Sequence, residues 1–182
     1  MLTDLQKRKL TAQFRLNDLS GNGYMERTDF ERYAARICQS LGLAPGSAEY
    51  DMVQAQTVQS WDNEQLKAFD ADGDGRISLE EHIASYDVSL NNPEMFQQLT
   101  VQYTQNVFGL WDQDHDGKLS VDEYAKLLWC YGGQDQDARN AFRHLDRDAD
   151  GYLDVDEIVK AVEEFYLSDD PDAPGNWLLG SY

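Results

Sequence analysis

The chain of 182 residues has no long apolar run, few basic residues and only four prolines. Its 15 lysines and arginines face 34 acidic residues, so the formal net charge is −19. Such a charge argues against binding to the polyanionic backbone of DNA or RNA, and against a basic helix on a membrane surface. No stretch approaches the roughly 20 apolar residues that cross a bilayer. We therefore expect neither a nucleic acid nor a membrane as a partner.

Cysteine is also scarce. Cys38 and Cys130 are too few for a disulfide framework and lie in helix-like segments, which favours a reducing compartment and a role as small buried groups. The N-terminal segment lacks the continuous apolar stretch of a secretory signal. Hydrophobic residues make up 41% of the chain, which is enough for a packed core. The sequence predicts a folded cytoplasmic protein, and we expect a monomer.

One twelve-residue pattern occurs four times, over residues 18–29, 70–81, 112–123 and 146–157. These four segments hold 19 of the 34 acidic residues. Like charges at this density raise the energy of the folded state unless a cation lies among them. The repeat therefore indicates a divalent cation as the partner of each segment.

The spacing within the repeat is typical of a calcium loop. Such a loop takes oxygen ligands from positions 1, 3, 5, 7, 9 and 12, turns at a glycine in position 6 and closes with a bidentate Glu. The second, third and fourth segments match at every one of these positions, with Ser78, Ser120 and Asp154 at position 9. The other predicted ligands, of which the position 7 residue uses its backbone carbonyl, are Asp70, Asp72, Asp74, Arg76 and Glu81; Asp112, Asp114, Asp116, Lys118 and Glu123; and Asp146, Asp148, Asp150, Tyr152 and Glu157.

The first segment departs from this pattern. Its predicted ligands are Asp18, Ser20, Asn22, the carbonyl of Tyr24, and Asp29. Asp29 is one methylene shorter than Glu and offers both oxygens to a metal less readily. The loop could therefore favour six ligands and accept Mg²⁺ as well as Ca²⁺, with the Glu26 side chain as a direct ligand. The alternative is a loop that stays empty.

Helical periodicity surrounds the loops. Apolar residues lie four positions before each loop, at Phe14, Leu66, Phe108 and Phe142, and others follow each loop at helical spacing. Ser78 with Glu81, and Ser120 with Glu123, form the capping-box pattern of a helix that starts at loop position 9. The apolar residue at position 8 (Met25, Ile77, Leu119 and Leu153) predicts a short strand that pairs one loop with another.

This combination resembles the EF-hand family over nearly the whole chain. The resemblance implies an all-α fold class, with four EF-hand helix-loop-helix units in two pairs, packed as a compact globule with short β-bridges between loops. Asn92 and Pro93 predict a helix start that separates an N-terminal pair (residues 1–92) from a C-terminal pair (residues 93–167). The remaining tail, residues 168–182, is either a loose end or docks through Trp177, Leu178 and Leu179.

The unequal loop spacing resembles the sarcoplasmic calcium-binding protein branch, which includes proteins similar to calerythrin. That resemblance implies an intracellular calcium buffer. The ligand patterns of the four loops themselves predict three to four bound Ca²⁺, because the second loop, which often lacks its ligands in this branch, is complete here. The alternative is a calcium-dependent regulator acting on a protein partner, which the sequence does not name. The four methionines form no cluster of the kind that sensors use to bind varied partners.

Other residues allow more specific hypotheses. The 21 aromatic side chains could line a ligand cavity, as in calcium-triggered photoproteins, but packing between two hand pairs also explains them. His82 occupies a slot where the other hands have Phe30, Tyr124 and Ile158. We expect a core-edge histidine bonded to a neighbour rather than a pH sensor. His115 and His144 are expected to be exposed, and we expect no enzyme activity.

Overall fold

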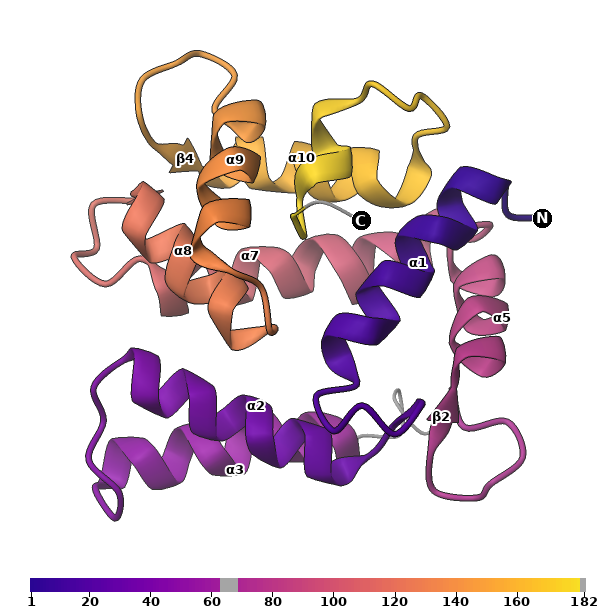
Figure 1. Cartoon of the computed structure of the whole chain (residues 1–182), viewed down its shortest axis with the longest axis horizontal. Coiled ribbons are helices and arrows are strands. Elements are labelled where there is room, and N and C mark those ends of the chain that lie inside the picture. Colours follow the sequence, from indigo (N-terminus) through magenta and orange to yellow (C-terminus); the bar gives the residue numbers. More distant parts are fainter. Residues whose placement is uncertain (63–68, 181–182) are drawn as a thin grey trace.

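The computed structural model describes residues 1–62 and 69–180, which are mostly helical (Figure 1). The N-terminal half contains α1 (Asp4–Asn17), β1 (Tyr24–Met25), α2 (Arg27–Ser40), α3 (Ala48–Asp62), β2 (Ile77–Ser78) and α5 (Leu79–Ser89). Leu66, which the sequence places at helical spacing before the second loop, is one of residues 63–68 and lies outside the described part of the chain.

The C-terminal half begins where the sequence predicts a helix start. Asn92 accepts a hydrogen bond on its side chain from the backbone N–H of Met95 (3.2 Å), and Pro93 occupies the first turn. The elements that follow are α6 (Pro93–Phe96), the π-helical η1 (Gln97–Val101), α7 (Gln102–Trp111), β3 (Lys118–Leu119), α8 (Val121–Cys130), α9 (Asp135–Leu145), β4 (Leu153–Asp154), α10 (Val155–Leu167) and the 3₁₀ turn η2 (Pro174–Trp177).

Two antiparallel bridges pair the loops. Strand β1 pairs with β2, which places Met25 opposite Ile77, and β3 pairs with β4, which places Leu119 opposite Leu153. All four of these side chains are buried. The predicted fold class, four helix-loop-helix units in two pairs with short bridges between loops, is therefore confirmed.

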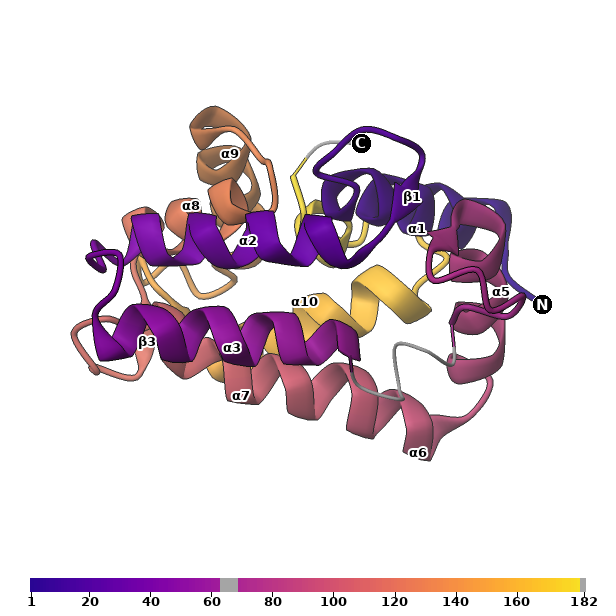
Figure 2. The same cartoon turned by 90° about the horizontal axis from the view of Figure 1, so that it is seen from below.

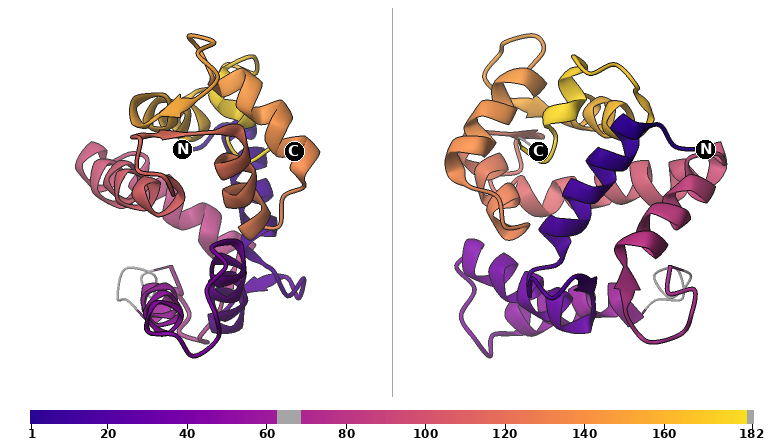
Figure 3. Two further views of the ribbon diagram at one scale, coloured as in Figure 1. Left: turned by 90° about the vertical axis from the view of Figure 1, so that its left-hand side faces the viewer. Right: turned by 45° about the vertical axis from the view of Figure 1, so that its right-hand side comes forward.

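One hydrophobic core joins the two halves of the molecule. Its fully buried members include Trp111, Tyr124 and Phe165 from the C-terminal half, and Leu10 comes from α1. Helix α1 packs against both α5 and α10, and α2 packs against α8. Helices α2 and α3 lie side by side in Figure 2 and form the lower layer in both views of Figure 3. Because each large apolar side chain contributes about 1.5–3 kcal/mol on burial, this shared core holds the halves together.

The buried polar and sulfur-containing side chains were only partly predicted. Cys38 and Cys130 are free and buried, as expected. His82 is 3% exposed, with its ring 5.5 Å from that of Phe14 and 4.9 Å from that of Tyr86. The expected hydrogen bond to a neighbour is only partly supported. The Leu10 backbone faces the ring, yet neither ring nitrogen has a partner of good geometry in the described chain.

No helix among residues 1–62 and 69–180 combines the length and the apolar character that a membrane crossing requires.

Candidate metal centre

The closing carboxylate of each complete loop reaches back to the start of its own loop. Its Oε1 accepts a hydrogen bond from the backbone N–H of loop position 2, which is Ala71 for Glu81 (3.0 Å), Gln113 for Glu123 (2.9 Å) and Arg147 for Glu157 (2.8 Å). Its Oε2 accepts from the backbone N–H of position 9, which is also the N-cap of the following helix. One side chain therefore closes the loop and starts α5, α8 or α10.

Three groups of carboxylates gather inside these loops. In each group, oxygens from positions 1, 3 and 12 all lie within 4.8 Å of one another. The groups are Asp70, Asp72 and Glu81; Asp112, Asp114 and Glu123; and Asp146, Asp148 and Glu157. Three negative charges at this separation repel strongly, so the arrangement favours a cation at its centre.

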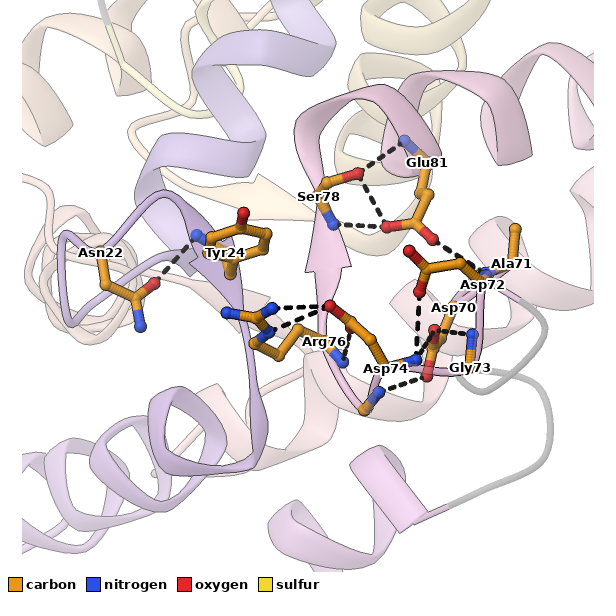
Figure 4. Close-up of polar contacts among 11 residues, drawn as sticks. Asn22, Tyr24, Asp70, Ala71, Asp72, Gly73, Asp74, Arg76, Ser78 and Glu81 are labelled. Atoms are coloured by element: carbon orange, nitrogen blue, oxygen red, sulfur yellow. Dashed lines mark hydrogen bonds and ion pairs between the residues drawn. The ribbon is translucent and has the colours of Figure 1, made fainter.

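The position 5 and position 6 residues shape the turn around each group. Asp74, Asp116 and Asp150 accept hydrogen bonds from the N–H of position 7, at 2.9, 2.8 and 2.9 Å respectively. The position 6 glycines, Gly75, Gly117 and Gly151, have φ values from 84° to 87°, a region that favours glycine. Figure 4 shows the second loop, where the Asp70 carboxylate accepts from the N–H groups of Gly73 and Gly75 (2.8 and 2.9 Å).

An orphaned oxygen indicates where a ligand fits. Asp146 Oδ1 is buried and has no hydrogen-bond partner within the described residues. A buried polar atom normally has a partner, and a bound cation would supply one. Carboxylate and carbonyl oxygens in a flexible twelve-residue loop suit the six- to eight-coordinate Ca²⁺ ion. The donor set therefore fits calcium, which would neutralise the charges that the loop collects.

Hydrogen bonds keep Glu81 and Glu123, two of the closing glutamates, ionised. The backbone N–H and hydroxyl of Ser78 hold the pKa of the Glu81 carboxyl below its usual value. Burial raises the pKa of Glu123, but hydrogen bonds from Ser120 and Gln113 outweigh it and leave this pKa lowered as well. Both groups are charged at neutral pH and ready to bind a cation.

Two basic side chains contact the aspartates at loop position 5. The sequence pattern had not predicted these contacts. Arg76 Nη2 lies 2.7 Å from Asp74 Oδ2, and its guanidinium lies 4.1 Å from the ring centre of Tyr24 in the paired loop (Figure 4). In the C-terminal pair, Lys118 forms an ion pair with Asp150 of the other loop and lies 5.3 Å from the ring centre of Tyr152. The available signal was the pairing of one tyrosine with one basic residue at position 7 of the paired loops.

The first loop keeps the turn but changes the closure. Asp29 is 1% exposed, and its Oδ1 accepts from the N–H of Ser20 (2.8 Å), which is position 3, instead of position 2. Its Oδ2 accepts from the N–H of Glu26 (3.0 Å), and the Ser20 hydroxyl donates to Asp18 (3.1 Å). This loop holds none of the three-carboxylate groups found in the described residues. Its ligand set, including Asn22 and Tyr24, stays a prediction.

The match to family models agrees with this geometry. Residues 59–128 match the EF-hand domain pair, and residues 137–167 match the EF-hand domain. The chain belongs to the EF-hand calcium-binding proteins, and it carries three candidate acidic loop sites.

Comparison with individual proteins shows which EF-hand proteins this chain resembles. The chain is 27% identical to calerythrin of Saccharopolyspora erythraea over 140 residues, which cover 76% of this chain and 78% of calerythrin. It is 28% identical to a Streptomyces coelicolor calcium-binding protein (TM-score 0.71, covering 91% and 99% of the two chains). It is 25% identical to the coelenterazine-binding protein of Renilla muelleri (TM-score 0.76, covering 100% of both chains). An amphioxus sarcoplasmic calcium-binding protein shares the fold (TM-score 0.71). The chain is thus similar in sequence to calerythrin and shares its fold with a sarcoplasmic calcium-binding protein.

Proposed function

We propose that this chain is an intracellular calcium buffer that binds Ca²⁺ in loops 70–81, 112–123 and 146–157. One observation carries the proposal. Each of these three loops gathers three carboxylates, and within each loop their oxygens lie within 4.8 Å of one another. In each loop the positions 1, 3, 5 and 12 side chains and the position 7 carbonyl are the proposed ligands. The proposal assigns the chain no catalytic role and treats it as a cytoplasmic monomer.

Calcium binding should also stabilise the fold. The closing glutamates accept hydrogen bonds from their own helix N-caps, so a bound ion that fixes the glutamate also fixes the first turn of the helix. A site saturated at a hundred times its dissociation constant adds about 2.7 kcal/mol of stability. A buffer with three such sites would be loose without calcium and compact with it.

The first loop is proposed as a fourth, weaker site that accepts Ca²⁺ or Mg²⁺. The shorter Asp29 side chain supports this idea, since Mg²⁺ requires tight octahedral geometry with fewer protein oxygens. The carboxylate of Glu26 accepts a hydrogen bond from the Asn22 amide (3.1 Å), which keeps it beside the predicted ligands. A calcium titration repeated with millimolar Mg²⁺ tests the idea, which predicts that only this site is lost to competition.

A regulatory role is the second candidate. The Streptomyces coelicolor relative is described as a protein of calcium-mediated regulation, which favours a sensor. The scarcity of methionine favours the buffer, because sensors use Met-rich grooves to fit varied targets. A hydrophobic dye separates the two. A buffer should bind less dye after calcium is added, and a sensor should bind more.

Calorimetry tests the ligand assignment directly. The Glu123→Gln variant removes the charge of a closing ligand, and we expect one calcium site to be lost or greatly weakened. Glu80→Gln is the matched control. Glu80 is next to the closing Glu81, but it occupies loop position 11, which supplies no ligand. Unchanged stoichiometry and affinity in Glu123→Gln would contradict the assignment.

A further inference from the structure

The C-terminal segment 173–180 packs on the C-terminal hand pair. Its turn η2 contacts both α9 and α10 (Figure 1). Ala173, Gly175 and Asn176 are buried, and Trp177, Leu178 and Leu179 pack against the main core. The segment therefore covers apolar surface that these helices would otherwise expose.

Three contacts link this segment, directly or through one further side chain, to residues near predicted calcium ligands. The Tyr124 hydroxyl donates a hydrogen bond to the backbone carbonyl of Leu178 (2.6 Å), and Tyr124 directly follows the closing Glu123. The ring of His144, two residues before Asp146, stacks on Trp177 with centres 4.2 Å apart and planes 4° apart. Both contacts come from residues within two positions of a predicted ligand of loop 112–123 or loop 146–157.

The third contact runs through Glu164 on α10. Its Oε2 accepts hydrogen bonds from the backbone N–H of Gly175 (2.9 Å) and from the Arg147 side chain (2.6 Å). Arg147 is position 2 of the fourth loop, and its own N–H donates to the closing Glu157. A chain of hydrogen bonds thus links a predicted calcium ligand to the backbone of the C-terminal segment.

Lys9 connects the same segment to α1. Its ammonium is buried and donates to the carbonyls of Glu164 and Ser168 (3.1 and 2.9 Å) and to Asn176 Oδ1 (3.0 Å). Asn176 in turn donates to the carbonyls of Asp170 and Pro171. The segment is therefore a built part of the fold with specific polar partners.

We propose that α8, α9 and α10 form a docking surface for segment 173–180 of the same chain, and that its docking and calcium binding by loops 112–123 and 146–157 strengthen each other. The inference rests on the proposed calcium binding by these two loops. A bound ion fixes Glu123 and Glu157, and with them Tyr124 and Arg147, which hold the segment. By linkage, the docked segment must then raise calcium affinity by the same factor.

Gly175 offers a test that leaves the loops untouched. A Cβ at this residue would lie 2.5 Å from the Ala161 carbonyl oxygen and 2.5 Å from Glu164 Cβ, so Gly175→Ala forces the segment off the surface. Gly109→Ala is the matched control, since its added methyl meets nothing within 4 Å. The amide NMR signals of Gly75, Gly117 and Gly151, followed in calcium–chelator buffers, report the three loops separately.

We expect Gly175→Ala to weaken calcium binding at loops 112–123 and 146–157 by at least about fivefold, the lower end of typical coupling between sites. Loop 70–81 and the Gly109→Ala control should keep their affinities. If Gly175→Ala binds calcium at these two loops as tightly as the unaltered chain, the coupling is refuted.

Hydrogen exchange, measured first in the unaltered protein, gives a second test that does not depend on whether Gly175→Ala folds. The Gly175 amide should exchange at least about tenfold more slowly with calcium than with chelator. Glu123→Gln should lose part of this protection, whereas Glu81→Gln should keep it. Equal exchange with and without calcium overturns the inference. If the unaltered chain binds no calcium at all, the proposed function fails instead, so the two failures are distinguishable.

Discussion

At the residue scale, the basic side chains at loop position 7 compete with the predicted metal. Lys118 pairs with Asp150 across the β3–β4 bridge and holds the pKa of that carboxyl below its usual value. A calcium ion bound to Asp150 would lie close to this ammonium, and the two positive charges would repel. Lys118 therefore partly neutralises the loop without metal and opposes its loading with metal.

Removing this charge should strengthen one site. We expect Lys118→Met to raise calcium affinity at loop 146–157 by about three- to tenfold at low ionic strength, because it removes a positive charge that pairs with the predicted ligand Asp150. Competition with a chelator of known affinity measures the change. Lys160→Met serves as the control. Lys160 is exposed on α10, so this variant also removes one positive charge, but from a residue outside the loop. An unchanged or lower affinity in Lys118→Met would refute the competition.

His82 gives the fold a dependence on pH. Burial lowers the pKa of its imidazole to about 4, against 6.5 in an unfolded chain, so the unfolded state takes up the proton first as pH falls. Stability that is complete above pH 6.5 is then lost progressively toward pH 4. Between pH 7.5 and 5.5 this single group should remove about 1.4 kcal/mol from the free energy of unfolding.

The matched variant is His82→Phe, because the other hands have Phe30, Tyr124 and Ile158 in this slot. Urea unfolding with excess calcium at pH 7.5 and pH 5.5 should show a smaller loss in His82→Phe than in the unaltered protein, by about 1.4 kcal/mol. Parallel losses in the two proteins would show that His82 does not titrate in this way.

At the element scale, the helix caps and the metal loops share residues. The Ser120 hydroxyl donates to Glu123 Oε2 (2.8 Å) and accepts from the Glu123 N–H (3.3 Å). Ser47 makes a similar cap at the start of α3, where it accepts from the N–H of Tyr50 (3.1 Å), but it lies outside the loops. The two serines therefore allow capping to be separated from metal binding.

We expect Ser120→Ala and Ser47→Ala each to lower the free energy of unfolding by about 1 kcal/mol in chelator, the usual cost of a lost N-cap. Only Ser120→Ala should also weaken calcium binding at loop 112–123, since its hydroxyl orients the closing glutamate. Calorimetric titration and urea unfolding of both variants make the comparison. Equal calcium affinities in the two variants would disprove the shared role.

The sequence predicted the elements whose chemistry is local. Ligand spacing, the position 6 glycines and the capping boxes lie within twelve residues, so the loops and the starts of α5 and α8 followed from the pattern alone. The contacts of Lys9 could not be predicted, because its acceptors lie more than 150 residues away. The same holds for the π-helical turn between α6 and α7, since helix periodicity does not distinguish one hydrogen-bonding step from another.

At the scale of the whole molecule, net charge opposes the compact state. The chain carries −19 at neutral pH, and three bound Ca²⁺ would reduce this to −13. Much of the acidity lies in the paired loops, which two short bridges hold together in the described structure. Without metal, the repulsion within and between loops acts against the same bridges that bury Ile77 and Leu153.

This repulsion predicts how salt should act on the two forms. Monovalent salt screens exposed charges, with a screening length of about 10 Å at 0.1 M and about 3 Å at 1 M. We expect the unfolding temperature in chelator to rise markedly as KCl is raised from 0.02 to about 0.5 M, because screening relieves the loops. With excess calcium the same change should have a much smaller effect, since the ions already neutralise the carboxylate groups. Calorimetric scans at four conditions test this, with choline chloride in place of KCl to separate screening from specific binding of potassium. An equal salt response with and without calcium would mean that charge repulsion in the loops does not destabilise the fold.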